Sequence, residues 1–182
     1  MADGSVVDTN VLIVASAADY GSPFRPDATP VQDDILRMEV LDWVQAFDCD
    51  AGRSVVLDWD WHICSEYQNK LNVDQDYGWL AMMAKKDRNE VVWIGLEMDS
   101  DGHAILPADL GSAVTDLADR KMVAAVLSAQ SDGHDCRLVN ACDTDWLDCE
   151  PALKNAGVHV HQLLGDWLKH KHSQKSKKQR GE

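Results

Sequence analysis

Short apolar runs alternate along the chain with longer segments of helical spacing, and this alternation is the feature that most restricts the fold. Helices that separate buried strands are the connections that parallel strands require. We therefore expect an α/β fold, a three-layer α/β/α sandwich with a mostly parallel central sheet. The predicted strands are 5–7, 54–57, 137–140 and 158–161, and the predicted helices are 11–18, 35–47, 61–71, 77–86 and 117–130, with a short helix beginning at Trp146.

Two further segments have weaker patterns. Residues 19–34 are rich in turn-forming residues and predict a loop. Residues 91–98 and 103–107 flank an Asp-Gly turn, which predicts a hairpin or a strand with a long turn.

The chain is strongly acidic, but its charge is unevenly distributed. Its formal net charge is −14, whereas residues 1–168 carry 30 acids against 11 bases. Residues 1–168 are long enough for one domain, and the polar segment 169–182 is expected to be a flexible tail. Because the domain should repel polyanions, the basic residues of the tail are candidate nucleic-acid contacts, although such tails more often serve solubility alone. These residues are Lys169, Lys171, Lys175, Lys177, Lys178 and Arg180.

Cysteine usage and hydropathy indicate the compartment. The five cysteines include no Cys-x-x-Cys pair and no histidines at zinc-finger spacing, which favours reduced thiols. The apolar runs are far shorter than the roughly 20 residues that span a bilayer, and the N-terminus lacks a signal-peptide pattern. We expect a cytoplasmic protein that has no membrane partner.

Acidic side chains follow two predicted strands and occur in two predicted helices. Asp8 ends the first strand, and Asp143 and Asp145 follow a later one. Glu66 lies at the margin of the buried face of a middle helix, and Asp119 opens a later helix. Because the carboxyl ends of parallel strands meet at one edge of a sheet, acids that follow two such strands should lie at the same edge.

These acids also have purely structural interpretations. In Asp-Thr-Asn, Thr9 or Asn10 could cap a helix that begins at Val11. Asp119 stands where an acid stabilises a helix N-terminus by about 0.3–1 kcal/mol. His62 could share a metal with Glu66, four residues later. A lone histidine on a helix is, however, more often an ordinary surface or core residue than a metal ligand.

The order of these short motifs resembles that of the PIN-domain nucleases. Asp-Thr-Asn follows a first strand, Glu-Tyr lies in a middle helix, Asp-Arg-Lys opens a later helix and Asp-x-Asp follows the next strand. Together the motifs span nearly all of residues 1–168. The resemblance implies that the metal-binding and catalytic acids are Asp8, Glu66, Asp119 and Asp143, with Asp145 as an auxiliary ligand and Thr9, Asn10 and Asn140 as polar support.

The family resemblance implies a metal-dependent endoribonuclease that uses Mg²⁺ or Mn²⁺ to hydrolyse RNA. It could be the toxin of a toxin–antitoxin or defence module, or an RNA-processing or structure-specific nuclease. A protein antitoxin or regulator and a second copy of the chain would be further partners. Divalent ions held by carboxylates can activate water and stabilise charge on a phosphate. Clustered acids repel one another, so we also predict at least one raised carboxyl pKa and stabilisation by divalent ions.

The chain departs from the family pattern in two places. Ala141 stands where Thr or Ser often precedes the Asp-x-Asp motif, and Asn140 could only partly replace the missing hydroxyl. Extra residues at 19–34 and 87–115 are expected to influence the choice of substrate or partner.

Two other functions are compatible with the sequence. A catalytically silent PIN-like module that binds RNA or a protein would retain the acids as caps and hydrogen-bonding groups. A Mg²⁺-dependent phosphatase on a similar sheet also begins with an acid after the first strand, but normally has a second Asp where this chain has Asn10. The sequence contains no P-loop, dinucleotide-binding or serine-hydrolase motif.

Overall fold

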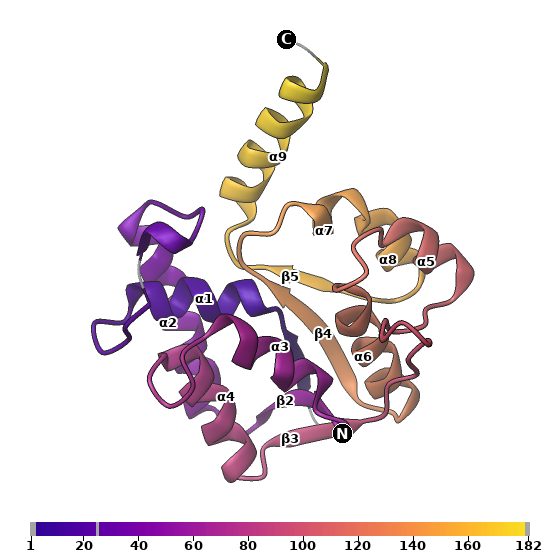
Figure 1. Cartoon of the computed structure of the whole chain (residues 1–182), viewed down its shortest axis with the longest axis horizontal. Helices are drawn as coiled ribbons and strands as arrows, with labels where there is room; N and C mark the ends of the chain where they lie inside the picture. The colour runs from indigo at the N-terminus through magenta and orange to yellow at the C-terminus, as the bar shows by residue number, and fades with distance from the viewer. Residues whose placement is uncertain (1–2, 25, 181–182) are drawn as a thin grey trace.

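The computed structural model describes residues 3–24 and 26–180, with side chains up to residue 178. Its strands form one sheet in the order β3-β2-β1-β4-β5, and every pairing between them is parallel. This confirms the predicted α/β class with a parallel central sheet (Figure 1). The strands are β1 (Asp3–Val7), β2 (Arg53–Asp58), β3 (Val91–Ile94), β4 (Asp135–Asn140) and β5 (Val160–Gln162).

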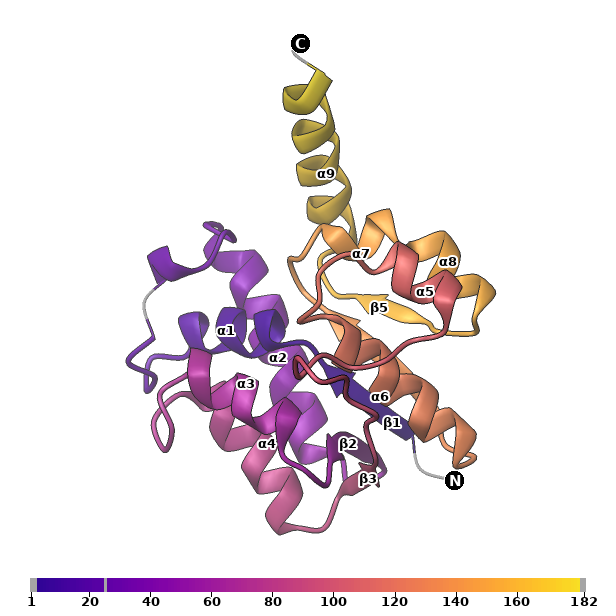
Figure 2. The ribbon, with the colours of Figure 1, turned by 45° about the vertical axis from the view of Figure 1, so that its right-hand side comes forward.

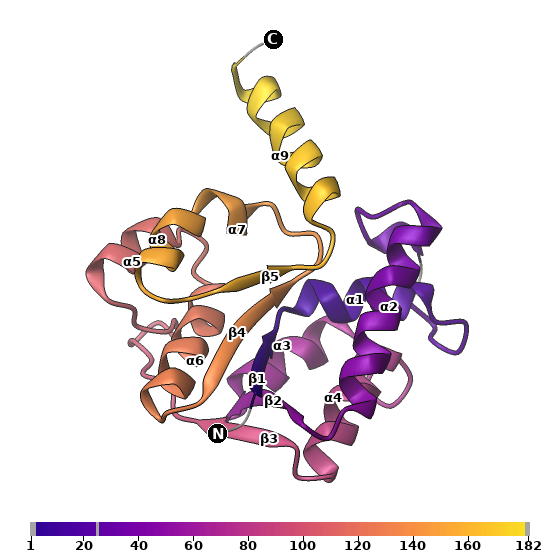
Figure 3. The same ribbon diagram turned by 180° about the vertical axis from the view of Figure 1, so that it is seen from behind.

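Helices cover both faces of the sheet (Figures 1 and 3). One side carries α1 (Thr9–Ala18), α2 (Asp34–Cys49), α3 (His62–Lys70) and α4 (Tyr77–Asp87), with a 3₁₀ turn, η1, at Pro26–Ala28. On the other side, α6 (Arg120–Ser131) packs across β1, β2, β3 and β4. The short helices α5 (Ala108–Ala113), α7 (Asp145–Asp148) and α8 (Glu150–Asn155) lie on the α6 side near β5.

The core explains why the strands are apolar runs rather than alternating patterns. A parallel sheet that is covered on both faces buries successive side chains of each strand. The central strands follow this rule, because Val6, Val7, Val56, Leu138 and Val139 are all fully buried. Below the carboxyl edge of the sheet, the interior is therefore dry and rigid.

Some predicted boundaries differ from the structure. Helix α6 begins at Arg120 instead of residue 117, because residues 117–119 form a turn before it. The segment predicted as a hairpin or as a strand with a long turn begins with β3, which joins the main sheet, and its long turn is closed only by an isolated antiparallel bridge between Met98 and Ala104. The last strand begins at Val160, two residues later than predicted.

Residues 169–180, for which we predicted a flexible tail, belong to α9 (Gly165–Arg180), which follows β5 and projects from the body (Figures 1 and 2). Lysine and glutamine are good helix formers, and the segment contains no proline. Leu168 is fully buried and anchors the base of the helix. Residues 181 and 182 lie outside the described part of the chain.

Two expectations about the chain as a whole can be compared with the described residues. None of the described helices combines the length and the apolar composition needed to span a bilayer. All five cysteines are free thiols, as their spacing predicted.

The close approach of α4 to α1 generates a stability prediction. A Cβ atom at Gly78 would lie 2.6 Å from the carbonyl oxygen of Leu12, and the Gly78 N–H donates to the Ser16 hydroxyl at 2.9 Å. Gly78→Ala must therefore push the two helices apart. We expect it to lower the free energy of unfolding by about 1–3 kcal/mol, measured by urea denaturation.

Gly111→Ala is the matched control, because Gly111 is also helical but its nearest neighbouring atom would lie 3.9 Å from an added Cβ. This variant should be as stable as the wild type or slightly more stable. Equal stability of the two variants would contradict the packing argument.

Candidate active site

Asp8 lies where the central strand β1 ends and α1 begins, and it is only 6% exposed. Its Oδ1 accepts the N–H of Asn10 at 3.2 Å, so Asp8 itself is the N-cap that we predicted for Thr9 or Asn10. Its Oδ2 accepts the indole N–H of Trp146 at 2.7 Å. Both oxygens are thus held in fixed directions, and each retains a further lone pair.

Helix α3 is fixed against the ends of β1 and β2. The Tyr67 hydroxyl donates to the carbonyl of Val7 at 2.5 Å. Asp58, the last residue of β2, accepts the N–H groups of His62 and Ile63 at 2.8 Å each and so caps the helix. The His62 ring also contacts Asp58, with 2.9 Å between Nδ1 and Oδ2, and no contact between His62 and Glu66 is present among the described side chains.

Glu66 extends from α3 between the first turns of α1 and α6. Its Oε1 accepts the Thr9 hydroxyl at 2.5 Å, and its Oε2 accepts the Lys121 ammonium at 2.5 Å. Both partners of this ion pair are largely buried, at 17% and 21% side-chain exposure. The carboxylate of Glu66 is therefore neutralised from one side while its other oxygen is bound to the segment that contains Asp8.

The turn after β4 is fixed to the start of α1 by two asparagines. Asn140 is fully buried, and its Oδ1 accepts from Asn10 Nδ2 at 2.9 Å and from the N–H of Asp143 at 3.1 Å. In return, Asn10 Oδ1 accepts the N–H groups of Ala141 and Cys142 at 2.9 and 3.2 Å. Asn140 therefore holds the turn that carries Asp143, which is a different role from that of a hydroxyl at position 141.

Asp119 and Asp143 complete the group of acids. Asp119 directly precedes α6, but its side chain makes no capping hydrogen bond, so a hydrogen-bonded cap does not explain its presence. Asp143 Oδ1 accepts the N–H of Asp145 at 2.9 Å.

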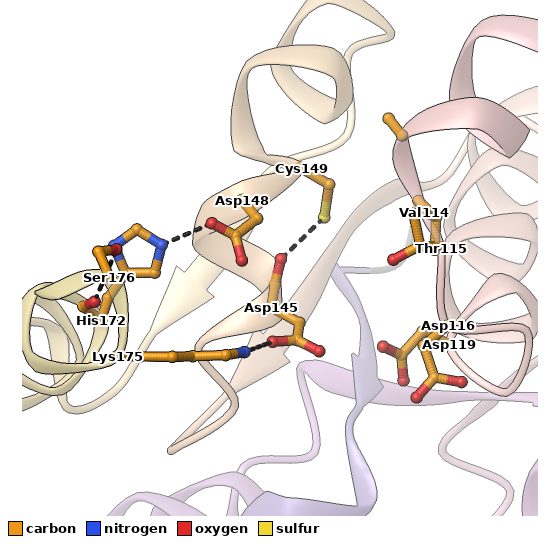
Figure 4. Close-up of a pocket in the computed structure, with 11 residues that line it drawn as sticks. Val114, Thr115, Asp116, Asp119, Asp145, Asp148, Cys149, His172, Lys175 and Ser176 are labelled. Carbon is orange, nitrogen blue, oxygen red and sulfur yellow. Dashed lines mark hydrogen bonds and ion pairs between the residues drawn. The ribbon is translucent and has the colours of Figure 1, made fainter. Parts of the chain in front are cut away.

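A cavity of about 210 Å³ lies beside these acids. Figure 4 shows Asp116 and Asp119 on one wall and α7 and α9 on the other. On the second wall, Lys175 Nζ lies 2.6 Å from Asp145 Oδ1, and His172 Nε2 lies 2.5 Å from Asp148 Oδ1. The pocket thus has acidic side chains on both walls, and Lys175 and His172 lie on the second wall.

Burial and mutual repulsion raise the pKa of three carboxyls. Burial raises the pKa of Asp8 to about 7 despite its two hydrogen bonds, and Asp143 and Glu66 add repulsion. The pKa of Asp119 rises to about 8 because of burial and then the charges of Asp8 and Asp143. Burial also raises the pKa of Asp143. The prediction of at least one raised carboxyl pKa is confirmed.

These carboxyls form a donor set that suits a hard divalent cation, because Mg²⁺ and Mn²⁺ prefer carboxylate oxygens. Their raised pKa values mean that a positive charge among them would be stabilising. Among the described residues, no three His, Cys, Asp or Glu side chains are already arranged to hold one ion. Asp8 would use the remaining lone pairs of its fixed oxygens, Asp119 and Asp143 would turn toward the ion, and Glu66 could join them after releasing Lys121.

No protein-family model matches the chain, and comparisons with curated proteins and with solved structures also give no match. The fold class therefore rests on the structure, and any family assignment is a proposal.

Sequence reasoning missed four residues at this edge of the sheet. Trp146 adjoins the Asp-x-Asp motif and Lys121 is the last residue of Asp-Arg-Lys, but neither was assigned a role. Asp116 and His172 reach the pocket through tertiary placement, and no local pattern points to either.

The predicted nucleic-acid contacts are distributed along α9. Lys175 lines the pocket, and the others with described side chains are exposed along the helix: Lys169, Lys171, Lys177 and Lys178. The side chain of Arg180 lies outside the described residues.

The raised pKa of Asp8 predicts how stability depends on pH without metal. Between about pH 4 and pH 7 the folded protein retains a proton that the unfolded chain has released. Its free energy of unfolding should therefore fall as pH rises, by up to about 1.4 kcal/mol per pH unit from this group. Asp8→Asn removes this contribution.

Urea unfolding in EDTA from about pH 5 to about pH 8 measures the effect. The stability of the wild type relative to Asp8→Asn should decline as pH rises. A difference that stays constant or grows with pH would show that burial does not raise this pKa.

Proposed function

We propose that the protein is a metal-dependent endoribonuclease of the PIN type, with Asp8, Glu66, Asp119 and Asp143 as its metal-binding acids. One observation carries the proposal. Four acids from widely separated segments lie close enough at the carboxyl edge of a parallel sheet for their charges to affect one another, and three of them have raised pKa values. One of the four, Asp119, also lines an open pocket.

The acids differ in how the surrounding residues hold them. The carboxylate of Asp8 is oriented by Trp146, and that of Asp143 accepts the N–H of Asp145, so both would bind with reduced loss of freedom. Glu66 would exchange its ammonium partner for an ion, and Asp145 would serve as an auxiliary ligand. A divalent ion bound there would supply an activated water and stabilise negative charge on the scissile phosphate.

The silent binding module is less well supported. In that hypothesis the acids serve as caps and hydrogen-bonding groups, and this accounts for Asp8, whose oxygens are both engaged. It accounts less well for Asp119, which makes no capping hydrogen bond and whose pKa of about 8 removes much of the negative charge that would stabilise the helix N-terminus near neutral pH. Burying acids whose pKa values are raised also lowers stability near neutral pH, a cost that a purely structural role would avoid.

The phosphatase hypothesis would need a second functional acid at position 10. Asn10 instead uses its amide group to bind Asn140 and the turn after β4. RNA is favoured over DNA by the family resemblance alone, and a toxin–antitoxin or defence setting is part of the same proposal.

The proposal predicts cleavage that requires both metal and Asp8. Purified protein should cut labelled RNA in Mn²⁺ or Mg²⁺ and not in EDTA. Asp8→Asn should lose about 100-fold or more of the rate, because loss of even an outer-shell partner of a metal costs about 10–100-fold. Asp42→Asn, at an exposed acid on α2, is the control and should keep wild-type activity. Metal-independent cleavage, or equal loss in both variants, would refute the proposal.

Metal binding should also be visible without any substrate. Adding Mn²⁺ at about pH 8 should raise the free energy of unfolding by about 2.7 kcal/mol when the ion is at 100 times its Kd, because only the folded chain assembles the acids. Asp143→Asn should lose most of this gain, whereas Asp42→Asn should retain it. If the free energy of unfolding of the wild type does not change with Mn²⁺ or Mg²⁺, the result counts against a metal site here.

A further inference from the structure

The charge of the body raises a question for any polyanionic substrate. Residues 1–168 have 19 more acids than bases, and such a body repels nucleic acid. Helix α9 has the opposite character, with six lysines and arginines and a single acid, Asp166. The positive charge of the chain is thus concentrated in one helix.

This helix starts at the candidate active site. It follows β5, whose carboxyl end lies on the same edge of the parallel sheet as the end of β1. Its inner face contributes His172, Lys175 and Ser176 to the wall of the acidic pocket (Figure 4). From there the helix runs outward from the body (Figure 2).

Three lysines of α9 form a stripe that passes the pocket. Lys171, Lys175 and Lys178 have the spacing i, i+4, i+7, which places them on one side of a helix, about 6 and 4.5 Å apart along its axis. All three are exposed. A shallow groove beside the stripe is lined by the same lysines together with Gln174 and Lys177.

The contacts that hold the outer part of α9 to the body are exchangeable. The ion pairs Lys175–Asp145 and His172–Asp148 join partly or largely exposed side chains, and such pairs are worth only about 0–1 kcal/mol. A phosphate could therefore replace Asp145 as the partner of Lys175. That exchange would leave Asp145 free beside the other acids.

A lipid surface fits this helix less well than a nucleic acid does. After Leu168 the helix contains no apolar residue that could enter a bilayer. Phosphate recognition needs only clustered cations.

We propose that α9 binds the phosphodiester backbone of an RNA strand along Lys171, Lys175 and Lys178 and so directs the strand to the acidic pocket. The identity of the polyanion rests on the proposed function. Each ammonium that contacts a phosphate releases a counterion. The logarithm of the association constant should therefore fall linearly with the logarithm of the salt concentration.

The test is RNA binding in EDTA, which does not depend on cleavage. Fluorescence anisotropy measures the affinity of the full chain for a labelled, unstructured RNA of about 20 nucleotides across a range of salt concentrations. The variant Lys171→Gln/Lys175→Gln/Lys178→Gln should lose about tenfold or more in affinity. Its salt slope should fall by about 2, because each of three contacts contributes about 0.7. Replacing the same lysines with arginine should preserve binding.

The matched control removes three lysines from the body, as Lys70→Gln/Lys86→Gln/Lys154→Gln, and so changes the net charge equally. It should alter RNA affinity less than twofold. Equal losses in the two triple variants, an α9 variant that binds like the wild type, or a wild type that binds vesicles containing phosphatidylserine but not RNA would each overturn the proposal.

The two proposals fail separately. A protein that binds RNA through α9 but cleaves none in Mn²⁺ or Mg²⁺ would refute only the nuclease. A protein that cleaves RNA, but whose RNA affinity is unchanged when the lysines of α9 are replaced, would refute only the proposal that α9 binds RNA.

Discussion

The structure depends on holding like charges together at the end of its central strand. Asp8 is almost completely buried, and the neighbouring charges of Asp143 and Glu66 add to the effect of burial in raising its pKa to about 7. In a parallel sheet, residues that follow different strands meet at one edge whatever their distance in sequence. The apolar core below that edge keeps solvent from screening the repulsion, and hydrogen bonds from the surrounding elements keep the acids in place.

The supporting contacts differ in rigidity across the site. Buried hydrogen bonds through Asn140 fix the turn that carries Asp143, whereas Lys175 of α9 holds Asp145 only through an exposed ion pair. The first kind of contact defines geometry, and the second kind exchanges readily with water, ions or a ligand. The acidic centre is thus supported by buried hydrogen bonds, whereas one wall of its pocket comes from the polar helix α9 and is joined to Asp145 by an exposed ion pair.

The sequence was sufficient for the sheet, most of the helices and the clustering of the acids, because each depends on local periodicity or on the rule that parallel strands end at one edge. It was insufficient where tertiary contacts decide. Residues 169–180 have no apolar periodicity that would mark them as a helix, and the ion pair of His172 with Asp148 has no local signature. The partnership of Trp146 with Asp8 joins residues 138 positions apart, so no spacing could reveal it.

That partnership has a consequence for how the sequence could diverge. Trp146 is among the largest fully buried side chains, and the same indole donates to Asp8. Most core positions accept another apolar residue of similar volume. Position 146 does not, because phenylalanine or leucine would leave part of the space empty and would also deprive Oδ2 of the buried Asp8 of its donor. The core and the acidic site therefore share Trp146, so a substitution at this position changes both of them.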